Sequence, residues 1–320
     1  MTMARITLLS ALAIGSALGA SSKAVCDRAC LKATLDQYLN AVVAHNPAAA
    51  PLSVGFRQTE NAMVRRRGDG LWESAKGLGK LQRRYFDVDS GQAGYFGTLE
   101  DAKVTAQGAT ATVTAIVTLR IRVEDRKITE AEWVISRKGD PGIGPGAGGQ
   151  ADAAYNDVDY LLAHPPAETR VVPKGERVSR GDLVAIANSY FDGLTAHDGK
   201  IILAHPGCVR EENGILTTQR PLPGGGQTDC TGEGAMTNIY AVTARRYPLV
   251  DDEAGVVLGL VLFQRKPGVP WRRNLLAEWF TIEQGKIRSI YAAMYYPDQD
   301  AVAPNWEPYD GNWAIQPPAK

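Results

Sequence analysis

Glutamates recur in this chain beside residues that suit acid–base chemistry. Glu60 precedes Asn61, and 152 positions later Glu212 precedes Asn213. A carboxylate beside an amide supplies a proton acceptor and a hydrogen-bond donor, although strand neighbours face opposite sides, so one of each pair can enter a cavity. Alternatively, each Asn forms a turn and each Glu faces solvent. Gly214 favours that alternative in the second copy, because Asn-Gly is typical of hairpin turns.

Two further candidate acids lie in copies of the triplet Ala-Glu-Trp, at 131–133 and 277–279. In the second copy, strand alternation places Glu278 on the same side as Phe280. A carboxylate buried on an apolar strand face has a raised pKa, which suits a general acid or base. A salt bridge at an interface or sheet edge is the alternative, and both interpretations also apply to Glu132.

Donors and ligand-binding side chains complete the candidate sites. Tyr85 is placed to stabilise negative charge on an oxygen, with packing as its alternative role. His197 lies at a predicted helix end, where the helix dipole favours a cation, so a structural role competes with catalysis. The side chains expected to line a ligand site in the first half are Asn61, Trp72, Arg84 and Trp133. The sequence has no phosphate-binding loop, HExxH motif or nucleophile elbow.

Composition indicates a globular protein with room for two domains: 320 residues, 44% hydrophobic and 22% charged. The first 24 residues have a basic start, a short apolar run and small residues, which is typical of a secretory signal. Cleavage after Ala24 would leave 33 basic and 35 acidic residues. We therefore expect a periplasmic or secreted protein. We expect no nucleic-acid partner and, after signal cleavage, no membrane association.

Four cysteines in an exported chain indicate disulfides. The most economical pairing joins Cys26 to Cys30 and Cys208 to Cys230, one of three possible pairings. A zinc site is the alternative, but the spacing lacks a tight CxxC pair, so no metal is expected.

The two halves of the sequence match one another in three blocks. Tyr38, His45, Glu60 and Asn61 match residues 152 positions later without a gap. Arg83-Arg84-Tyr85 with Val88-Asp89 matches Arg245-Arg246-Tyr247 with Val250-Asp251, and the Ala-Glu-Trp triplets close the series. We interpret the blocks as two homologous domains.

Each half starts with an amphipathic helical pattern and continues with alternating strands, such as 113–121 and 257–263, which predicts an α+β fold. A hairpin is predicted to turn at Glu283–Lys286. The expected boundaries are a signal at 1–24, domains at 25–138 and 179–297, a Gly/Pro-rich linker at 139–178 and a C-terminal strap at 298–320.

The element order, with stretches such as AEWFTIEQGKIRSIY and VSRGDLVAIANSYFDGLTAHDG, resembles the nuclear-transport-factor-two-like or SnoaL-like superfamily. It is more closely similar to a secreted, duplicated family of bacteria and filamentous fungi whose biochemical role is largely unassigned. The resemblance implies tandem cystatin-like cones, each an antiparallel sheet curved around helices, with an open apolar mouth.

Relatives in that superfamily include ketosteroid isomerase, scytalone dehydratase, polyketide cyclases and lyases of lignin-derived aromatic dimers. The resemblance therefore implies a cofactor-independent lyase or isomerase acting on a small aromatic or polycyclic molecule. We expect Glu60, Glu132 and Tyr85 to be catalytic, with His197, Glu212, Asn213 and Glu278 as second-domain counterparts. Other relatives only bind or dimerise, so a binding module or homo-oligomer is the alternative.

Overall fold

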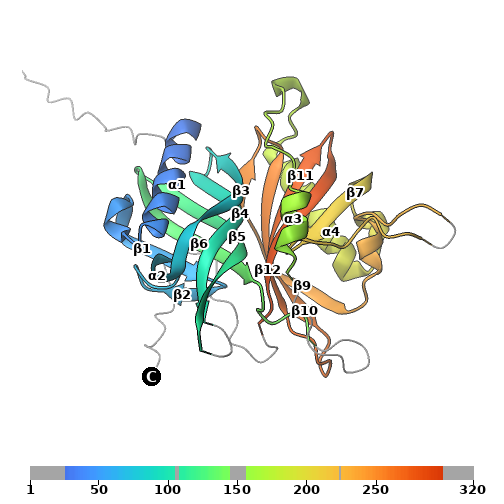
Figure 1. Ribbon diagram of the computed structural model, residues 1–320. Coiled ribbons are helices and arrows are strands. Elements are labelled where there is room, and N and C mark those ends of the chain that lie inside the picture. The colour runs from blue at the N-terminus through green and yellow to red at the C-terminus, as the bar shows by residue number, and fades with distance from the viewer. Residues whose placement is uncertain (1–25, 105–107, 145–155, 223–224, 298–320) are drawn as a thin grey trace, which may run out of the picture.

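The computed structural model describes residues 26–104, 108–144, 156–222 and 225–297 and contains two tandem α+β domains (Figure 1). The predicted signal and C-terminal strap lie outside the described residues. The first domain consists of α1 (Arg28–Val43), η1 (Pro47–Ala49), β1 (Leu52–Glu60), β2 (Met63–Arg65), α2 (Leu71–Ser74), β3 (Ala75–Asp87), β4 (Gln92–Val104), β5 (Thr110–Glu124) and β6 (Lys127–Arg137). The second consists of α4 (Arg180–Ala196), η3 (Gly199–Ile201), β7 (Ala204–Glu212), β8 (Ile215–Leu216), η4 (Gly232–Ala235), β9 (Ile239–Asp251), β10 (Val256–Arg265), β11 (Asn274–Glu283) and β12 (Lys286–Tyr295). Helices α3 (Val158–Ala163) and η2 (Lys174–Glu176) lie between them.

The two domains share one topology. The first sheet has the order β2-β1-β6-β5-β4-β3, and the second has the order β8-β7-β12-β11-β10-β9. Neighbouring strands are antiparallel except for β1 with β6 and β7 with β12, which are parallel. The sheets are therefore mixed rather than wholly antiparallel, because the strand after each long helix joins the last strand of its domain.

Local sequence signals explain where these elements begin and turn. Asp27 and Ser179 cap α1 and α4 by accepting hydrogen bonds from backbone N–H groups. The hairpin between β11 and β12 turns at Gln284 and Gly285, both with positive φ, as the Gly-Lys sequence predicted. Asn213 and Gly214 form the corresponding two-residue turn between β7 and β8.

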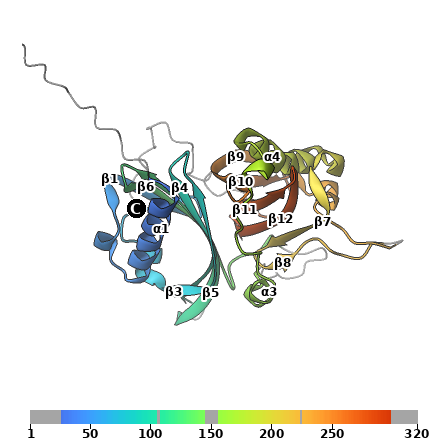
Figure 2. The same ribbon diagram turned by 90° about the horizontal axis from the view of Figure 1, so that it is seen from above.

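Both faces of each sheet are buried. The inner face, toward the domain's own helix, packs on α1 in the first domain and on α4 in the second. The outer faces pack against one another in a third core that includes Tyr85, Phe96, Leu258 and Trp279 (Figure 2). Strand β10 consequently has apolar residues on both sides, not only at the alternating positions.

Reciprocal ion pairs fasten the two domains. Arg28, at the start of α1, donates to both carboxylate oxygens of Asp251 at 2.9 Å. In the reverse direction, Arg180, at the start of α4, donates to Asp87. Backbone N–H groups complete the exchange: Phe86 donates to Asp251 and Val250 donates to Asp87. Exchanging each group for its counterpart reproduces the other set, so the two domains are arranged about an approximate two-fold axis.

Trp279 fills the middle of this interface. Its ring centroid lies 4.5 Å from that of Tyr85, and its indole N–H donates to Thr118 Oγ1 at 3.0 Å. The ring lies against Gly94, where a Cβ atom would overlap Cη2 of the indole. The close approach of the two sheets at this point therefore requires glycine.

The hydrogen bonds confirm the first matched block and correct the other two. Asn61 exchanges side-chain hydrogen bonds with the backbone of Ile135, as Asn213 does with that of Met294. Strand β6 is therefore the counterpart of β12, whereas the second Ala-Glu-Trp triplet lies in β11, the counterpart of β5. The prediction that the triplets mark one strand is wrong.

The consequence for individual residues follows from the strand registers. Glu278 occupies the position of Leu119, and Tyr291 occupies that of Glu132. In the second block, Asp87 rather than Asp89 corresponds to Asp251, as their reciprocal contacts show. The predicted match was two residues out of register.

We expect Asp87→Asn to lower the free energy of unfolding by about 2–3 kcal/mol, because it removes a buried charge that accepts hydrogen bonds from Arg180 and two backbone N–H groups. Hydrogen bonds to Asp87 outweigh its burial and hold its pKa below the usual value. The wild type should therefore lose this contribution only as the pH falls below about 4.

Urea unfolding at neutral pH is the measurement. The matched control is Asp89→Asn, two residues further on and exposed, which should change the free energy by less than about 0.5 kcal/mol. Equal effects of the two substitutions would contradict the assignment of Asp87 to the interface.

Candidate functional site

A buried arginine contacts three glutamates on the inner face of the second sheet. Arg210 and Glu212 are alternate residues of β7 and therefore share that face. Glu278 comes from β11, and Glu233 comes from η4. We call Arg210, Glu212, Glu233 and Glu278 the Arg210 cluster.

Arg210 makes an ion pair with each of the three carboxylates. Its Nη2 donates to Glu278 Oε1 at 2.6 Å, and its Nη1 contacts Glu212 and lies 3.5 Å from Glu233 Oε2. The guanidinium also lies over the ring of Tyr190, 5.4 Å from its centroid. The side chains of Arg210 and Glu278 are both wholly inaccessible to solvent. The cluster is therefore part of the domain core, not its surface.

Because the cluster has three carboxylates and one guanidinium, a proton on one of the carboxylates is favoured. Burial, opposed by Arg210 and reinforced by Glu212 and Glu233, raises the pKa of Glu278 to about 7. Burial also raises the pKa of Glu233, again opposed by Arg210. Within the described residues, Glu278 Oε2 and Tyr190 Oη have no hydrogen-bond partner. The raised pKa of Glu278 thus favours a bound proton in the cluster below about pH 7.

The Arg210 cluster borders a cavity of about 340 Å³. Its lining residues include charged side chains, Arg210, Glu212, Arg220, Glu233 and Arg265, and apolar ones, Ile143, Met236, Ile239, Phe263 and Tyr296. The volume lies within the range of roughly 300–1,000 Å³ usual for small-molecule sites. The mixture of apolar walls with a few convergent charged groups is also typical of such sites.

Glu233 reaches the cavity because the chain before it is tied down. The disulfide between Cys208 and Cys230 joins β7 to the segment just ahead of η4, and the second disulfide joins Cys26 to Cys30, so both predicted pairings are confirmed. Next to it, Gly199 approaches the Thr231 carbonyl so closely that a Cβ would clash. The residues just before η4 are thereby fixed against β7 and η3.

The first domain has aromatic rings at the corresponding positions. Gln58 replaces Arg210 and accepts a hydrogen bond from the indole of Trp72, which enters from α2 as Glu233 enters from η4. Trp133 corresponds to Ala292 of the second domain. The carbonyl of each accepts a hydrogen bond from the backbone N–H of the turn asparagine in its own domain. The rings of Trp72 and Trp133 pack against Tyr38 with centroids 5.3 and 6.3 Å away. Aromatic packing thus occupies the first cone.

The structure does not bring together the three residues expected to be catalytic. Glu60 lies on the inner face and accepts a hydrogen bond from Leu71 N at 2.7 Å; burial raises its pKa. Glu132 and Tyr85 lie on the outer face, in the domain interface. Glu132 is held by Arg120 and Arg246, which outweigh its burial and lower its pKa. The salt-bridge alternative therefore describes Glu132.

Tyr85 and the other candidates have structural contacts. Burial against Trp279 raises the pKa of Tyr85, in keeping with a packing role. Arg84 binds Asp36 of α1 at 2.7 Å. His197 is the exposed, left-handed C-cap residue of α4, at the predicted helix end. The amides Asn61 and Asn213 hold the last strand of each sheet. Of the predicted second-domain residues, Glu212 and Glu278 meet at the Arg210 cluster.

Sequence reasoning missed Arg210 and Glu233. Alternation along β7 was the available signal for Arg210, because it stands two residues before Glu212 and must share its face. Glu233 lies in a Gly-rich loop whose path depends on the disulfide, and no periodicity marks it.

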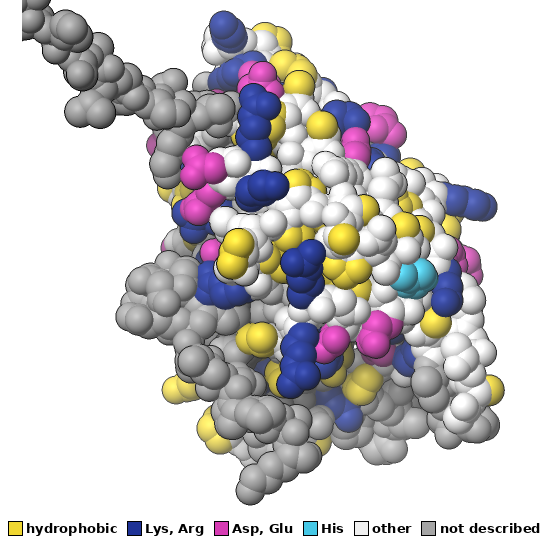
Figure 3. All heavy atoms as spheres, turned by 90° about the vertical axis from the view of Figure 1, so that its left-hand side faces the viewer, with side chains coloured by type: hydrophobic (Ala, Val, Ile, Leu, Met, Phe, Trp, Pro, Cys, Tyr) yellow, Lys and Arg dark blue, Asp and Glu magenta, His cyan; other side chains and the backbone are white. Residues whose placement is uncertain are grey.

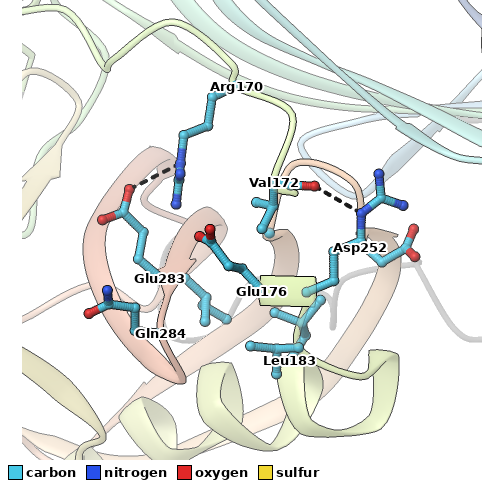
Figure 4. Close-up of a pocket in the computed structure, with 11 residues that line it drawn as sticks. Arg170, Val172, Glu176, Leu183, Asp252, Glu283 and Gln284 are labelled. Atoms are coloured by element: carbon cyan, nitrogen blue, oxygen red, sulfur yellow. Dashed lines mark hydrogen bonds and ion pairs between the residues drawn. The ribbon is translucent and has the colours of Figure 1, made fainter. Parts of the chain in front are cut away.

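A second cavity, of about 310 Å³, lies between the segment 170–178 and the turns of the second sheet (Figure 4). Arg170 extends toward Glu283, 3.4 Å away, and Arg177 donates to the Val172 carbonyl. The side chains of Arg170 and Glu283 are 49% and 34% exposed. Its charged groups are thus solvated, which makes it the weaker candidate for acid–base chemistry.

Three further observations on the described residues concern surface charge, metal ligands and membrane-spanning helices. On the face in Figure 3, basic and acidic side chains are interspersed rather than gathered by sign. Within the described ranges, no group of three His, Cys, Asp or Glu residues is arranged to hold a metal ion. None of the described helices is long and apolar enough to span a membrane.

We expect Glu278→Gln to flatten the pH dependence of stability. The pKa of Glu278 is raised from 4.5 to about 7 in the folded state, so its favourable contribution is present below about pH 4.5 and is lost as the pH rises toward 7. Relative to the variant, the wild type should lose on the order of 3 kcal/mol between about pH 5 and 8.

Denaturant unfolding of both proteins at the two pH values measures this difference. Glu124→Gln, which alters a half-exposed side chain in the first domain, should leave the wild-type pH dependence unchanged. Parallel pH profiles for the wild type and Glu278→Gln would show that Glu278 titrates normally.

Comparison with known proteins locates similarity in the second domain. A family model described as a domain of unknown function (DUF8021) matches residues 176–294, the region that holds α4 through nearly all of β12. No curated protein matches the chain. Among solved structures, the chain is similar to a protein of unknown function with a cystatin-like fold from Methylobium petroleophilum PM1. That match has 13% identity and a TM-score of 0.28, and it covers 47% of this chain and 99% of the other.

Proposed function

We propose that this protein is a cofactor-independent lyase or isomerase whose active site is the cavity of the second domain. The observation that carries the proposal is the Arg210 cluster, in which two carboxylates line a small-molecule-sized cavity and share one buried arginine. Acid–base enzymes require two groups of similar chemistry in different protonation states. Burial raises the pKa of Glu233, which makes it the proton donor of the pair, and Glu212, in contact with Arg210, is the acceptor.

Each cavity carboxylate has a distinct role in this proposal. Glu212 accepts a proton from a carbon next to a substrate carbonyl, and the electron pair of the broken C–H bond moves onto the carbonyl oxygen. Glu233, as the acid, then donates a proton. In an isomerase the proton goes to a different carbon, which takes back the electron pair; in a lyase it goes to the departing group, whose bond to the neighbouring carbon breaks as the returning pair forms a carbon–carbon double bond. Proton transfers of this kind contribute roughly 10²–10⁴-fold to rate. Arg210, buried behind the two carboxylates, favours the negative charge on the substrate oxygen through its own charge.

The apolar lining residues indicate the chemical class of the substrate. Phe263, Ile239 and Met236 supply apolar surface to the cavity, next to the charged side chains. Flat aromatic or polycyclic molecules match such a surface, because they bury large apolar area with few rotatable bonds. A binding module without chemistry is the rival interpretation, and the variants below distinguish the two.

Solvent deuterium exchange tests the proposal without knowledge of the natural substrate. Aromatic ketones and aldehydes that raise the melting temperature of the protein are incubated with it in D₂O, and deuterium at the carbon next to the carbonyl is measured by mass spectrometry. We expect exchange above the buffer rate for at least one bound compound. Glu212→Gln and Glu233→Gln should each reduce it by about 100-fold or more.

Glu60→Gln is the matched control, because Glu60 is the first-domain counterpart of Glu212. It should leave the exchange rate within about twofold of wild type. If bound compounds exchange no faster than in buffer, or if both cavity variants retain the wild-type rate, the second cone binds ligands without acid–base chemistry.

A further inference from the structure

The positive charges of the second-domain cavity are not confined to Arg210. Arg220 and Arg265 also line it, so three guanidinium groups face one space that is bordered by two carboxylates. Arg265 is buried, and its three guanidinium nitrogens donate to the carbonyls of Arg272 and Asn238 and to Asn274 Oδ1, so it adds a fixed positive charge to the cavity wall. Arg220 is exposed where it lines the cavity; its charge acts on Glu233, but among the described residues no carboxylate lies within ion-pair distance of it.

The carboxylates of the cluster already form ion pairs. Glu212, Glu233 and Glu278 all contact Arg210, so a cationic ligand would compete with that arginine for each of them. An anionic group entering the cavity can pair with the exposed Arg220, and the charge of Arg265 in the wall favours it further. Arginine forks bind planar carboxylates well because two N–H groups match the two oxygens.

Adding an anion to this site also changes its proton balance. The groups that face Glu278 are Arg210 and Glu212 from β7, Glu233 from η4, Tyr190 from α4 and Tyr247 from β9. If all three carboxylates are ionised, the Arg210 cluster carries two net negative charges. A bound anion makes ionisation of these carboxylates less favourable, so one of them is protonated as the ligand binds.

We propose that the cavity of the second domain binds a small aromatic carboxylate and takes up a proton from solvent as it does so. The ring lies on Phe263 and Met236, and the carboxylate pairs with the exposed Arg220. The inference rests on the proposed function only in naming its substrate class; binding of the anion does not require catalysis.

Proton-linked binding can be measured directly on the whole protein by titration calorimetry. Benzoate is the probe, and benzamide, which has the same shape without the charge, is its control. At about pH 8, benzoate should bind at least about tenfold more tightly than benzamide. Heats in buffers of different ionisation enthalpy should report uptake of up to about one proton per benzoate, falling toward zero near pH 5, where the cluster already holds its proton.

Arg220→Gln should weaken benzoate binding by about tenfold and leave benzamide unchanged. The matched variant is Arg288→Gln, an exposed arginine at the start of β12 that does not line the cavity, and it should bind both ligands as the wild type does. Equal affinity for benzoate and benzamide, tighter binding of benzylamine, or benzoate binding without proton uptake would each overturn the inference.

The two proposals fail in different ways. Benzoate binding with proton uptake but no deuterium exchange would leave an anion-binding domain without catalysis. Deuterium exchange that depends on Glu212 and Glu233 but is indifferent to ligand charge would keep the enzyme and remove the carboxylate as substrate class.

Discussion

The face-to-face contact of the two sheets is the constraint on which the rest of this structure depends. Each domain has one long helix, which covers one side of its sheet, while the strands are apolar on both sides. The uncovered face must be buried elsewhere, and the two domains bury these faces against each other. Arg28 and Arg180 reach across this contact to opposite aspartates, which fixes the relative position of the domains.

Because the outer faces of the two sheets pack against each other, a site in the described domains must lie on an inner face. The two domains fill this inner space differently. Trp72 and Trp133 stabilise the first cone by burying large apolar surfaces. In the second cone, Glu233 and Ala292 stand at those places, and the volume released is lined by charged groups. Such buried charges are costly to desolvate and are tolerated because Arg210 binds all three acids.

Sequence reasoning reached the fold more securely than the site. Helical and alternating periodicity, with the Asn-Gly and Gln-Gly turns, predicted the elements because each depends on neighbours along the chain. The site depends on which face of a strand is inner, and one misplaced residue reverses that. The repeated Ala-Glu-Trp triplet suggested equivalent acids, yet Glu132 lies in the interface and Glu278 in the core of a domain. The repeated triplet did not distinguish β12, the counterpart of β6, from its neighbour β11.

The glycine beneath Trp279 makes the two halves of this chain non-interchangeable. The strand registers place Leu258 at the position of Gly94 and Arg120 at that of Trp279. Two second domains paired with each other would force each indole onto a leucine, and two first domains would place an arginine over the glycine. An ancestor built from two identical subunits can give rise to this arrangement, but neither present-day half can return to it. The fused gene is thus the unit on which further evolution of the site must act.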